Sequence, residues 1–309
     1  MRSRNTVALG PALVAVAAAL WGMDALLRRP LAQSTTAATI VFGEHVVLVL
    51  LTLPFLAGAL AAVFRAGPRY IVAAVVVGAG ASALATILFT EAFVRGSDPV
   101  TPVVLQKVQP LVAVVCARFI LGEHPRKNFL WFFLGGLVGV WLIAFPHPTE
   151  ISAHGLTPVL FALGAAVLWA LGTVLGRLLT TRLSFQHVTT LRFAFGLPAS
   201  FIAVLVLGAP LFASGHDEVW IATLALVTGF IALGLYYYGL QRTPAVTASI
   251  AELAFPVSAT IVGYVAFDAT LSASQWAGLL LTTLVVLLLP VRGRKIVDVE
   301  PGGLAPAQA

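Results

Sequence analysis

The chain has 309 residues, of which 60% are hydrophobic and only 10% are charged, with a formal net charge of +6. A soluble domain carries roughly 25% charged residues, so most of this surface must face something other than water. Apolar runs near the roughly 20 residues needed to cross a bilayer recur along the whole sequence. The composition therefore excludes an ordinary soluble domain and predicts a polytopic membrane protein.

Breaks rich in charge, proline and glycine divide the chain into ten candidate membrane helices. The expected spans are residues 6–27, 37–63, 70–94, 99–121, 128–146, 155–179, 186–208, 218–240, 245–267 and 273–291. The first is expected to be an uncleaved helix and not a signal peptide, because its apolar run passes Trp21 and more spans follow. The short linkers leave no room for an inserted soluble domain. Residues 292–309 are polar and rich in Pro and Gly, and are expected to form a disordered cytoplasmic tail.

The basic residues lie mainly at the ends of these spans, a distribution that argues against binding to nucleic acid. With the N-terminus inside the cell, the cytoplasmic segments carry most Lys and Arg, and the outer loops carry only Arg28, Arg29 and Arg95. This positive-inside bias predicts a multi-pass protein of the cell (plasma or inner) membrane with both termini in the cytoplasm. The single cysteine, Cys116, excludes an intrachain disulfide.

The second half of the chain repeats the first in the same order, since AALWGMDALLRR returns as AVLWALGTVLGR 148 residues later. The paired positions are Trp21 with Trp169, Glu44 with Arg192, Gln106 with Glu252, Pro110 with Pro256, and Glu123 with Asp268. Each half has five expected spans, an odd number, so the halves must cross the membrane in opposite senses. Inverted repeats of this kind are common in secondary transporters, with the substrate site near the midplane. We therefore expect an all-α protein with one five-helix repeat in residues 1–148 and an inverted one in 149–291.

Several short motifs share their order with a known family. They are LGE at 121–123, RF at 192–193, YYYGLQRTPAVTAS at 236–249 and VAFDATLSASQWAGLLLTTL at 265–284. Together they make the chain resemble the EamA family of the drug/metabolite transporter (DMT) superfamily over about residues 6–291. The resemblance implies ten helices in two repeats and transport of small metabolites or drugs, often outward. Glu44 departs from the family, in which a basic residue is common at this place, so no relative's substrate is carried over.

Six ionisable residues fall inside the expected spans, and they are Asp24, Glu44, Glu91, Lys107, Arg192 and Glu252. A charge near the centre of a membrane helix is costly, so such residues usually face a cavity or a partner. Depths along the helices pair Glu44 with Lys107 near the outer face and Arg192 with Glu252 near the inner face. These pairs either gate a midplane cavity in alternation or only brace the helices, and the sequence leaves both readings open.

Four of the six residues are acidic and two are basic, so at least one carboxylate lacks an internal partner. Burial raises the pKa of a carboxyl group, and proton-coupled transport follows as a hypothesis with Glu44, Glu91 or Asp24 as the carrier. For Asp24 and Glu91 the plainer alternative is contact with the outer water or with Arg28 and Arg95.

Other residues of the spans are candidates for the pathway. Trp21 and Trp169 either stack on a solute or, as we favour, pack between helices. Three consecutive tyrosines end at Tyr238 and point in different directions, so one of them can line the pathway while the others form an aromatic belt. His45 and His187 are expected to be ordinary interfacial residues near span ends. Pro110 and Pro256 are expected to kink the fourth and ninth helices, because proline cannot donate a backbone hydrogen bond.

The sequence lacks the motifs HExxH, GxSxG and a phosphate-binding Gly-rich loop, and its histidines have no metal-ligand spacing. We therefore expect no enzyme, no metal and no cofactor. The favoured function is a secondary active transporter, an exporter of small metabolites or of amino-acid-like or drug-like solutes, working by alternating access. Its partners are the solute, the bilayer and, by hypothesis, protons. A membrane scaffold, a lipid-handling protein or an importer of the same fold is the alternative, and monomer and homodimer both stay open.

Overall fold

The structure, a computed structural model, describes residues 5–95, 106, 108–125, 128–145, 156–266 and 270–291. In chain order its helices are α1 (Asn5–Gly22), α2 (Asp24–Ser34), α3 (Ala37–Ala66), α4 (Pro68–Val75), η1 (Val76–Leu84), α5 (Ala85–Arg95), α7 (Gln109–Ile120), α8 (Phe129–Ala144), α9 (Leu156–Leu179), α10 (Phe185–Leu207), α11 (Gly215–Leu224), η2 (Ala225–Ile231), α12 (Ala232–Leu240), α13 (Ala245–Ala251), α14 (Ala254–Ala266) and α15 (Ala273–Val291). The two η elements are π-helical. The described residues contain helices and no strand, so the all-α prediction is confirmed for them.

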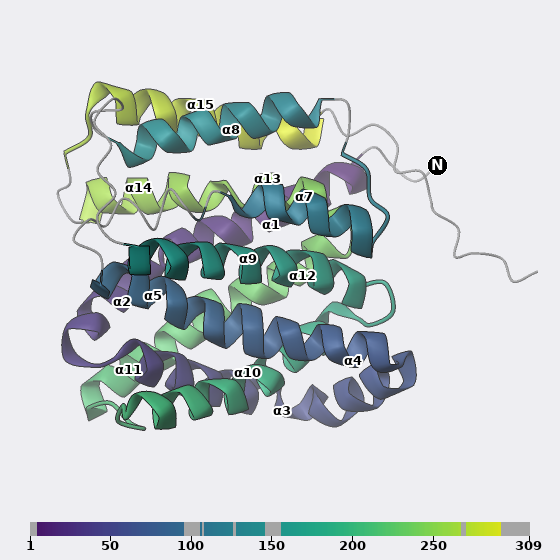
Figure 1. Cartoon of the computed structure of the whole chain (residues 1–309), viewed down its shortest axis with the longest axis vertical. Helices are drawn as coiled ribbons and strands as arrows, with labels where there is room; N and C mark the ends of the chain where they lie inside the picture. The colour runs from purple at the N-terminus through teal and green to yellow at the C-terminus, as the bar shows by residue number, and fades with distance from the viewer. Residues whose placement is uncertain are drawn as a thin grey trace, which may run out of the picture.

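The helices run side by side and stack from α8 and α15 at one edge to α3, α10 and α11 at the other (Figure 1). Specific pairs make the closest contacts: α3 packs on α10, and α8 packs on α15. In the first half α1 lies against α12 and α14, and in the second half α9 lies against α5 and α7. The bundle is therefore held together by helices that pair across the two halves of the chain.

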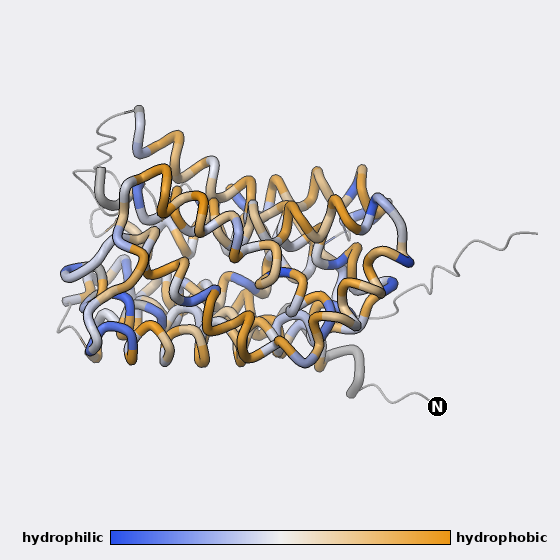
Figure 2. The backbone as a smooth tube through the Cα atoms, turned by 90° about the horizontal axis from the view of Figure 1, so that it is seen from below, coloured by the Kyte–Doolittle hydropathy of each residue, from blue (hydrophilic) through white to orange (hydrophobic). Residues whose placement is uncertain are grey.

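The distribution of side chains is that of a protein in lipid. Phe119 is 84% exposed and Trp131 is 77% exposed, whereas Glu44 and His45 are buried. Hydrophilic segments gather toward the two ends of the bundle, and the length between them is mainly apolar with a few hydrophilic stretches (Figure 2). A soluble protein has the reverse arrangement of large apolar and charged groups. Among the described residues, seven helical segments are long and apolar enough to cross a membrane, and three shorter apolar helices accompany them. The chain is thus a multi-pass membrane protein.

Close helix contacts depend on small residues. A Cβ added to Gly278 of α15 would lie 2.5 Å from the carbonyl oxygen of Gly139 of α8. On the same helix, the Thr282 hydroxyl donates to the Gly278 carbonyl at 2.9 Å and so satisfies its own donor within the helix. Helices in membranes associate through such small residues, because lipid offers no hydrophobic driving force between them. The α8 and α15 contact is therefore fixed by glycine at the crossing point.

The end of the first span and the form of the two expected proline kinks differ from those predicted. The first span breaks at Met23 and resumes as α2, which continues to Ser34, so Arg28 lies in a helix and not in a loop. The prolines stand at helix starts: Pro110 is the second residue of α7, and Pro256 is the third residue of α14, after a turn at Glu252 and Leu253. The expected kinks thus take the form of helix starts that follow interruptions.

The segment after α7 is tied to the second half by Glu123. Its Oε2 atom accepts the backbone N–H of Val246 at the start of α13 (3.3 Å), and its Oε1 atom lies 3.9 Å from Nε of Arg177. Burial raises the pKa of the Glu123 carboxyl, although the backbone N–H groups of Ala245 and Val246 and the charge of Arg177 oppose the shift. The carboxyl therefore caps the start of α13. Its expected counterpart, Asp268, lies outside the described residues.

Candidate functional site

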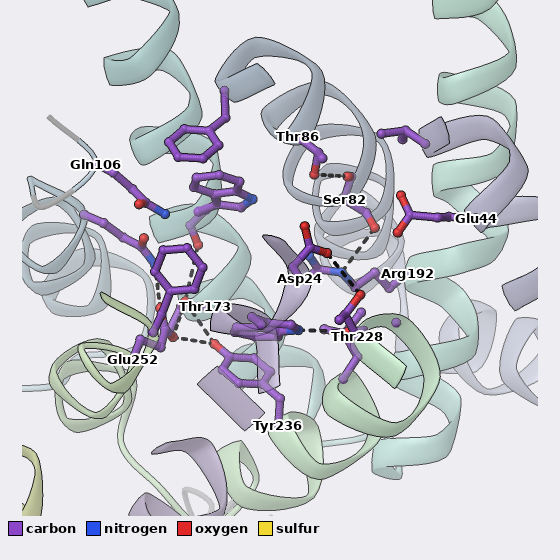
Figure 3. A pocket seen from close by; sticks show the side chains of 18 of the residues that line it. Asp24, Glu44, Ser82, Thr86, Gln106, Thr173, Arg192, Thr228, Tyr236 and Glu252 are labelled. Atoms are coloured by element: carbon purple, nitrogen blue, oxygen red, sulfur yellow. Dashed lines mark hydrogen bonds between the residues drawn. The ribbon is translucent and has the colours of Figure 1, made fainter. Parts of the chain in front are cut away.

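A cavity of about 270 Å³ lies inside the bundle, and both halves of the chain line it. The first half contributes residues of α1, α2, α3, η1, α5 and α7, and the second half contributes residues of α9, α10, η2, α12, α13 and α14. Figure 3 shows one polar group around Asp24, Glu44 and Arg192 and another around Glu252 and Tyr236. The cavity therefore has two polar regions, with apolar and aromatic side chains between them.

Interruptions of the helices bring polar side chains into this space. Pro256 lacks an N–H and cannot accommodate the carbonyl of Glu252 in a regular helix, so the chain turns at Glu252 and Leu253 between α13 and α14. The turn places the Glu252 side chain in the cavity. The π-helical stretches η1 and η2 likewise supply Ser82 and Thr228 to its wall. Departures of this kind from α-helical geometry are frequent at functional sites.

The first polar region is an acid–arginine cluster formed by Asp24, Arg28 and Glu44. Arg28 Nη2 donates to Asp24 Oδ1 at 3.1 Å and to the two Glu44 oxygens at 3.0 and 3.2 Å, and its Nε also donates to Asp24. Thr228 of η2 donates its hydroxyl to Asp24 at 3.3 Å. One arginine thus neutralises part of the charge of two carboxylates and joins α2 to α3.

Arg192 of α10 has a different environment. Its Nε donates to Ser82 Oγ at 3.3 Å, its Nη1 to the Tyr237 hydroxyl at 3.1 Å, and its Nη2 to the Ala81 carbonyl at 3.3 Å. All three acceptors are neutral. No carboxylate oxygen of the described residues lies within 4.0 Å of this guanidinium. Arg192 is therefore oriented by neutral groups at the wall of the cavity.

Glu252 is also held by neutral partners. Its Oε1 atom accepts hydrogen bonds from the Tyr236 hydroxyl at 2.8 Å and from the Thr173 hydroxyl at 3.0 Å. Its Oε2 atom accepts one from the Gln109 side-chain amide. These donors come from α12, α9 and α7, so a single carboxyl group joins three helices at the interruption between α13 and α14.

His45 of α3 is joined to Arg192 through the Ser82 hydroxyl. Its Nδ1 lies 2.7 Å from the Val41 carbonyl oxygen, which only accepts, so Nδ1 carries a hydrogen. In the neutral imidazole Nε2 then accepts from the Ser82 hydroxyl at 3.0 Å, and Ser82 in turn accepts from Arg192. His45 is only 4% exposed and lines the cavity, so the expectation that it is an interfacial residue is wrong.

Aromatic side chains form much of the remaining wall. Trp21 of α1 lies against Tyr236 with ring centroids 5.1 Å apart, and Trp169 of α9 lies against Phe89 at 5.0 Å. The Trp21 indole N–H donates to the Thr228 carbonyl at 3.0 Å, so its polar atom is satisfied and the ring is left for apolar contact. Both tryptophans pack between helices, as expected, and both also line the cavity.

Most of the residues singled out from the sequence come together in this cavity. Those that line it are Trp21, Asp24, Glu44, Pro110, Trp169, Arg192 and Glu252. Glu91 of α5 and Pro256 of α14 lie on lining elements without forming part of the wall. Tyr238 instead packs against Phe185, with ring centroids 5.1 Å apart, and under the Arg242 guanidinium. Lys107 lies outside the described residues.

The expected pair of Arg192 with Glu252 is not observed, and the expected pair of Glu44 with Lys107 involves a residue outside the described ones. Arg28, which was predicted to lie in an outer loop, forms ion pairs with both Glu44 and Asp24. Contact between Asp24 and Arg28 was one of the alternatives predicted for Asp24. Arg192 and Glu252 were expected to pair, but each makes its own set of hydrogen bonds with neutral groups. The reason is geometric, because each side chain is already held by neighbours on the helices that flank it.

Comparison with known proteins agrees with this architecture. The family model of the EamA-like transporter family matches residues 156–290. The riboflavin transporter ImpX of Fusobacterium nucleatum is 28% identical over 293 residues, which cover 90% of this chain and 96% of that transporter. An uncharacterized transporter of Clostridium kluyveri is 32% identical over 168 residues, 52% of this chain and 54% of that protein. A solved crystal structure of a protein has the same fold, with a TM-score of 0.68 at 19% identity and coverage of 92% of this chain and 99% of the other.

The fold and the polar cavity define a helical membrane protein of the transporter class, as the relatives' names indicate. Within that class, residues 156–290 match the EamA-like transporter family, which confirms the resemblance to the EamA family of the drug/metabolite transporter superfamily.

Proposed function

We propose that the protein is a secondary active transporter that moves a small organic solute by alternating access, with the central cavity as the binding site. The observation that carries this proposal is the cavity itself, which has charged and aromatic walls supplied by both halves of an otherwise apolar bundle. Ligand sites of this kind are concave, largely apolar and equipped with a few placed polar groups. A membrane scaffold has no need of such a space.

An inverted repeat of two five-helix units underlies the mechanism. The seven long segments and three shorter apolar helices found among the described residues are compatible with the ten proposed spans. Features at equivalent places in the two halves support the repeat: η1 and η2 interrupt the third and eighth expected spans, and the pairs Trp21–Tyr236 and Trp169–Phe89 occupy matching positions. In repeats of this kind one unit rocks against the other around a fixed midplane site.

The proposed solute is a small metabolite with a flat ring. The proposed direction of transport is outward, because the resemblance to the EamA family implies it. The aromatic wall of Trp21, Phe89 and Trp169 supports the ring. The Fusobacterium relative is named as a riboflavin transporter, so riboflavin is the first compound to test here. The purified protein in liposomes should show saturable riboflavin flux that empty liposomes lack. Flux that stays linear with concentration for riboflavin and for a panel of amino acids and aromatic metabolites would contradict the transporter proposal.

Protons are the proposed coupling ion. The described cavity residues include the carboxylates of Asp24, Glu44 and Glu252 against the guanidinium groups of Arg28 and Arg192, so acids are in excess. Of the candidate carriers predicted from the sequence, Asp24 and Glu44 line the cavity. Flux should fall when an ionophore collapses the pH gradient across the liposome membrane. Flux that is the same with and without the gradient would remove proton coupling from the proposal.

A further inference from the structure

The two arginines of the cavity wall have opposite surroundings, although both lie within one space. Arg28 directs Nε and Nη2 at the carboxylates of Asp24 and Glu44. Arg192 meets only the Ser82 and Tyr237 hydroxyls and the Ala81 carbonyl. A guanidinium away from water is favourable only when an anion or several acceptors compensate it. Among the described residues Arg192 is therefore compensated by three neutral acceptors and by no anion.

The unused hydrogen-bonding capacity of Arg192 has a definite form. A guanidinium has five N–H groups in a planar fork. The described residues accept from the single Nε hydrogen, from one hydrogen of Nη1 and from one of Nη2. One N–H on each terminal nitrogen is left, so the group retains two donors in one plane. Two such donors match a carboxylate or another pair of neighbouring acceptor oxygens.

The sequence explains why no carboxylate of α9 pairs with Arg192. With the 148-residue offset of the repeat, Asp24 and Arg28 of the first half correspond to Gly172 and Gly176 of α9. A Cβ at Gly172 would lie 4.0 Å from Nη1 of Arg192, and one at Gly176 would lie 2.8 Å from Cε1 of Tyr237. The glycines thus leave room for Arg192 and Tyr237 to meet. At equivalent positions the second half therefore has glycine in place of Asp24 and Arg28, and Arg192 in place of Glu44.

Glu252 does not supply the missing acceptor. Its two oxygens already accept from Tyr236, Thr173 and Gln109, and they lie more than 4.0 Å from the Arg192 guanidinium nitrogens. Aromatic side chains, among them Trp21 and Trp169, line the same cavity as these two groups. Such a wall favours a flat apolar ring, and the arginine favours an acceptor at the edge of that ring.

We propose that Arg192 is the residue that recognises the solute, and that the solute joins a flat aromatic ring to an electron-rich edge or tail with two neighbouring acceptor atoms. This inference rests on the proposed function, because it assigns the cavity to a transported solute. A carboxylate tail presents two such oxygens, and an imide-bearing ring such as alloxazine presents a carbonyl oxygen beside a ring nitrogen at its edge. Arg28 has no equivalent role, because its partners belong to the protein.

The test is equilibrium binding by isothermal titration calorimetry on the purified, detergent-solubilised protein, with two matched pairs of probes. Indole-3-propionate and 3-ethylindole share a ring but differ in the carboxylate. Alloxazine and phenazine share a flat tricycle but differ in the imide edge. The acceptor-bearing member of at least one pair should bind about tenfold or more tightly than its partner, since hydrogen bonds to a charged donor are among the strong ones.

Variants then assign the preference to Arg192. Arg192→Lys keeps the charge but removes the planar fork, and it should weaken the acceptor-bearing probe about tenfold while leaving the acceptor-free probe unchanged. Arg182→Lys is the matched control, because Arg182 is exposed in the turn between α9 and α10 and should bind all probes as the wild type does. Melting curves without ligand show whether each variant is folded. The comparison of probes on the wild-type protein tests the proposal even if a variant does not fold.

Each outcome decides the proposal. A preference confined to indole-3-propionate identifies a carboxylate, and one confined to alloxazine identifies an imide edge. Equal affinities within both pairs, no binding of any probe, or wild-type affinities in Arg192→Lys would overturn the proposal. Saturable flux in liposomes without the preference would remove this inference and leave the transporter intact. A preference for the acceptor-bearing probe without any flux would support recognition by Arg192 and contradict the transporter proposal.

Discussion

Arg28 and Arg192 line the same cavity, and the difference between them separates two uses of a charge inside a membrane. Arg28 lies between Asp24 and Glu44, so that its charge is matched within the protein. Arg192 is oriented by neutral acceptors and keeps donors that the described residues do not use. Charges at membrane depth usually either pair with one another or mark a solute pathway. The first arginine is a brace, and the second is placed to meet a solute.

The comparison predicts that the largest loss of stability comes from Arg28. Arg28→Gln leaves two carboxylates together without their cation. Removing one partner of a buried ion pair costs about 3–5 kcal/mol of stability. The loss here should be smaller than that, because the side chains are partly exposed. Thermal melting in detergent should show a clear decrease in Tm. The triple variant Asp24→Asn, Arg28→Gln, Glu44→Gln should recover most of it. An Arg28→Gln protein that melts like the wild type would show that the cluster is not a brace.

A smaller effect is expected at Glu252, the other charged group held by neutral partners. Glu252→Gln keeps one acceptor oxygen for Tyr236 and Thr173 but sets its amide nitrogen against the donors of Gln109. The cost should be about 1–3 kcal/mol, unless the Gln109 amide turns over to accept. Thermal melting measures this loss, with the double variant Glu252→Gln, Gln109→Glu as the control that restores an acceptor. Equal melting of the single variant and the wild type would mean that these bonds add nothing to stability.

Tyr237 tests how Arg192 is positioned. Tyr237→Phe removes the hydroxyl that accepts from Nη1 and leaves the ring packing in place. Losing one hydrogen bond of about 1 kcal/mol should weaken the acceptor-bearing probe about fivefold through a less fixed guanidinium. The readout is the affinity for each member of the matched probe pairs. A uniform loss for both members would indicate a general change of the cavity and not of Arg192.

Thr228 should produce the smallest effect. Thr228→Val removes a hydroxyl whose single hydrogen is shared between Asp24 at 3.3 Å and the Leu224 carbonyl at the end of α11 at 3.0 Å. Asp24 keeps Arg28 as its main partner, so the expected loss of stability is about 0.5 kcal/mol. The probe affinities should not change. A loss of stability as large as that of Arg28→Gln would show that η2, and not the arginine, holds the cluster.

The sequence predicts the helices of this bundle more closely than it predicts their contacts. The expected span 37–63 corresponds to α3, and 273–291 corresponds to α15, because long apolar runs bounded by charge and proline are a strong signal. Arg28 was placed in a loop because two arginines and a proline resemble the end of a span. The helix continues there because the Asp24 and Glu44 carboxylates hold Arg28 against α3.

The neutral residues around the charged groups gave little signal in the sequence. Ser82, Gln109, Thr173 and Tyr236 are polar residues within apolar runs, and such residues are common in membrane helices without any role in a site. Their contribution depends on the rotation of each helix and on the interruptions at η1 and at Glu252, which periodicity does not fix. The 148-residue offset is the signal that could have found Gly172 beside Arg192 and Gly176 beside Tyr237.

The claim that Arg192 meets the solute while Arg28 braces the fold is tested most directly by measuring melting and probe affinity on two variants. Arg28→Gln and Arg192→Gln should be compared with the wild type in one detergent. We predict a clear decrease in Tm for Arg28→Gln. For Arg192→Gln we predict nearly unchanged melting and an affinity about tenfold or more weaker for the acceptor-bearing probe. An Arg192→Gln protein that melts far below the wild type and keeps the wild-type affinity would contradict the account.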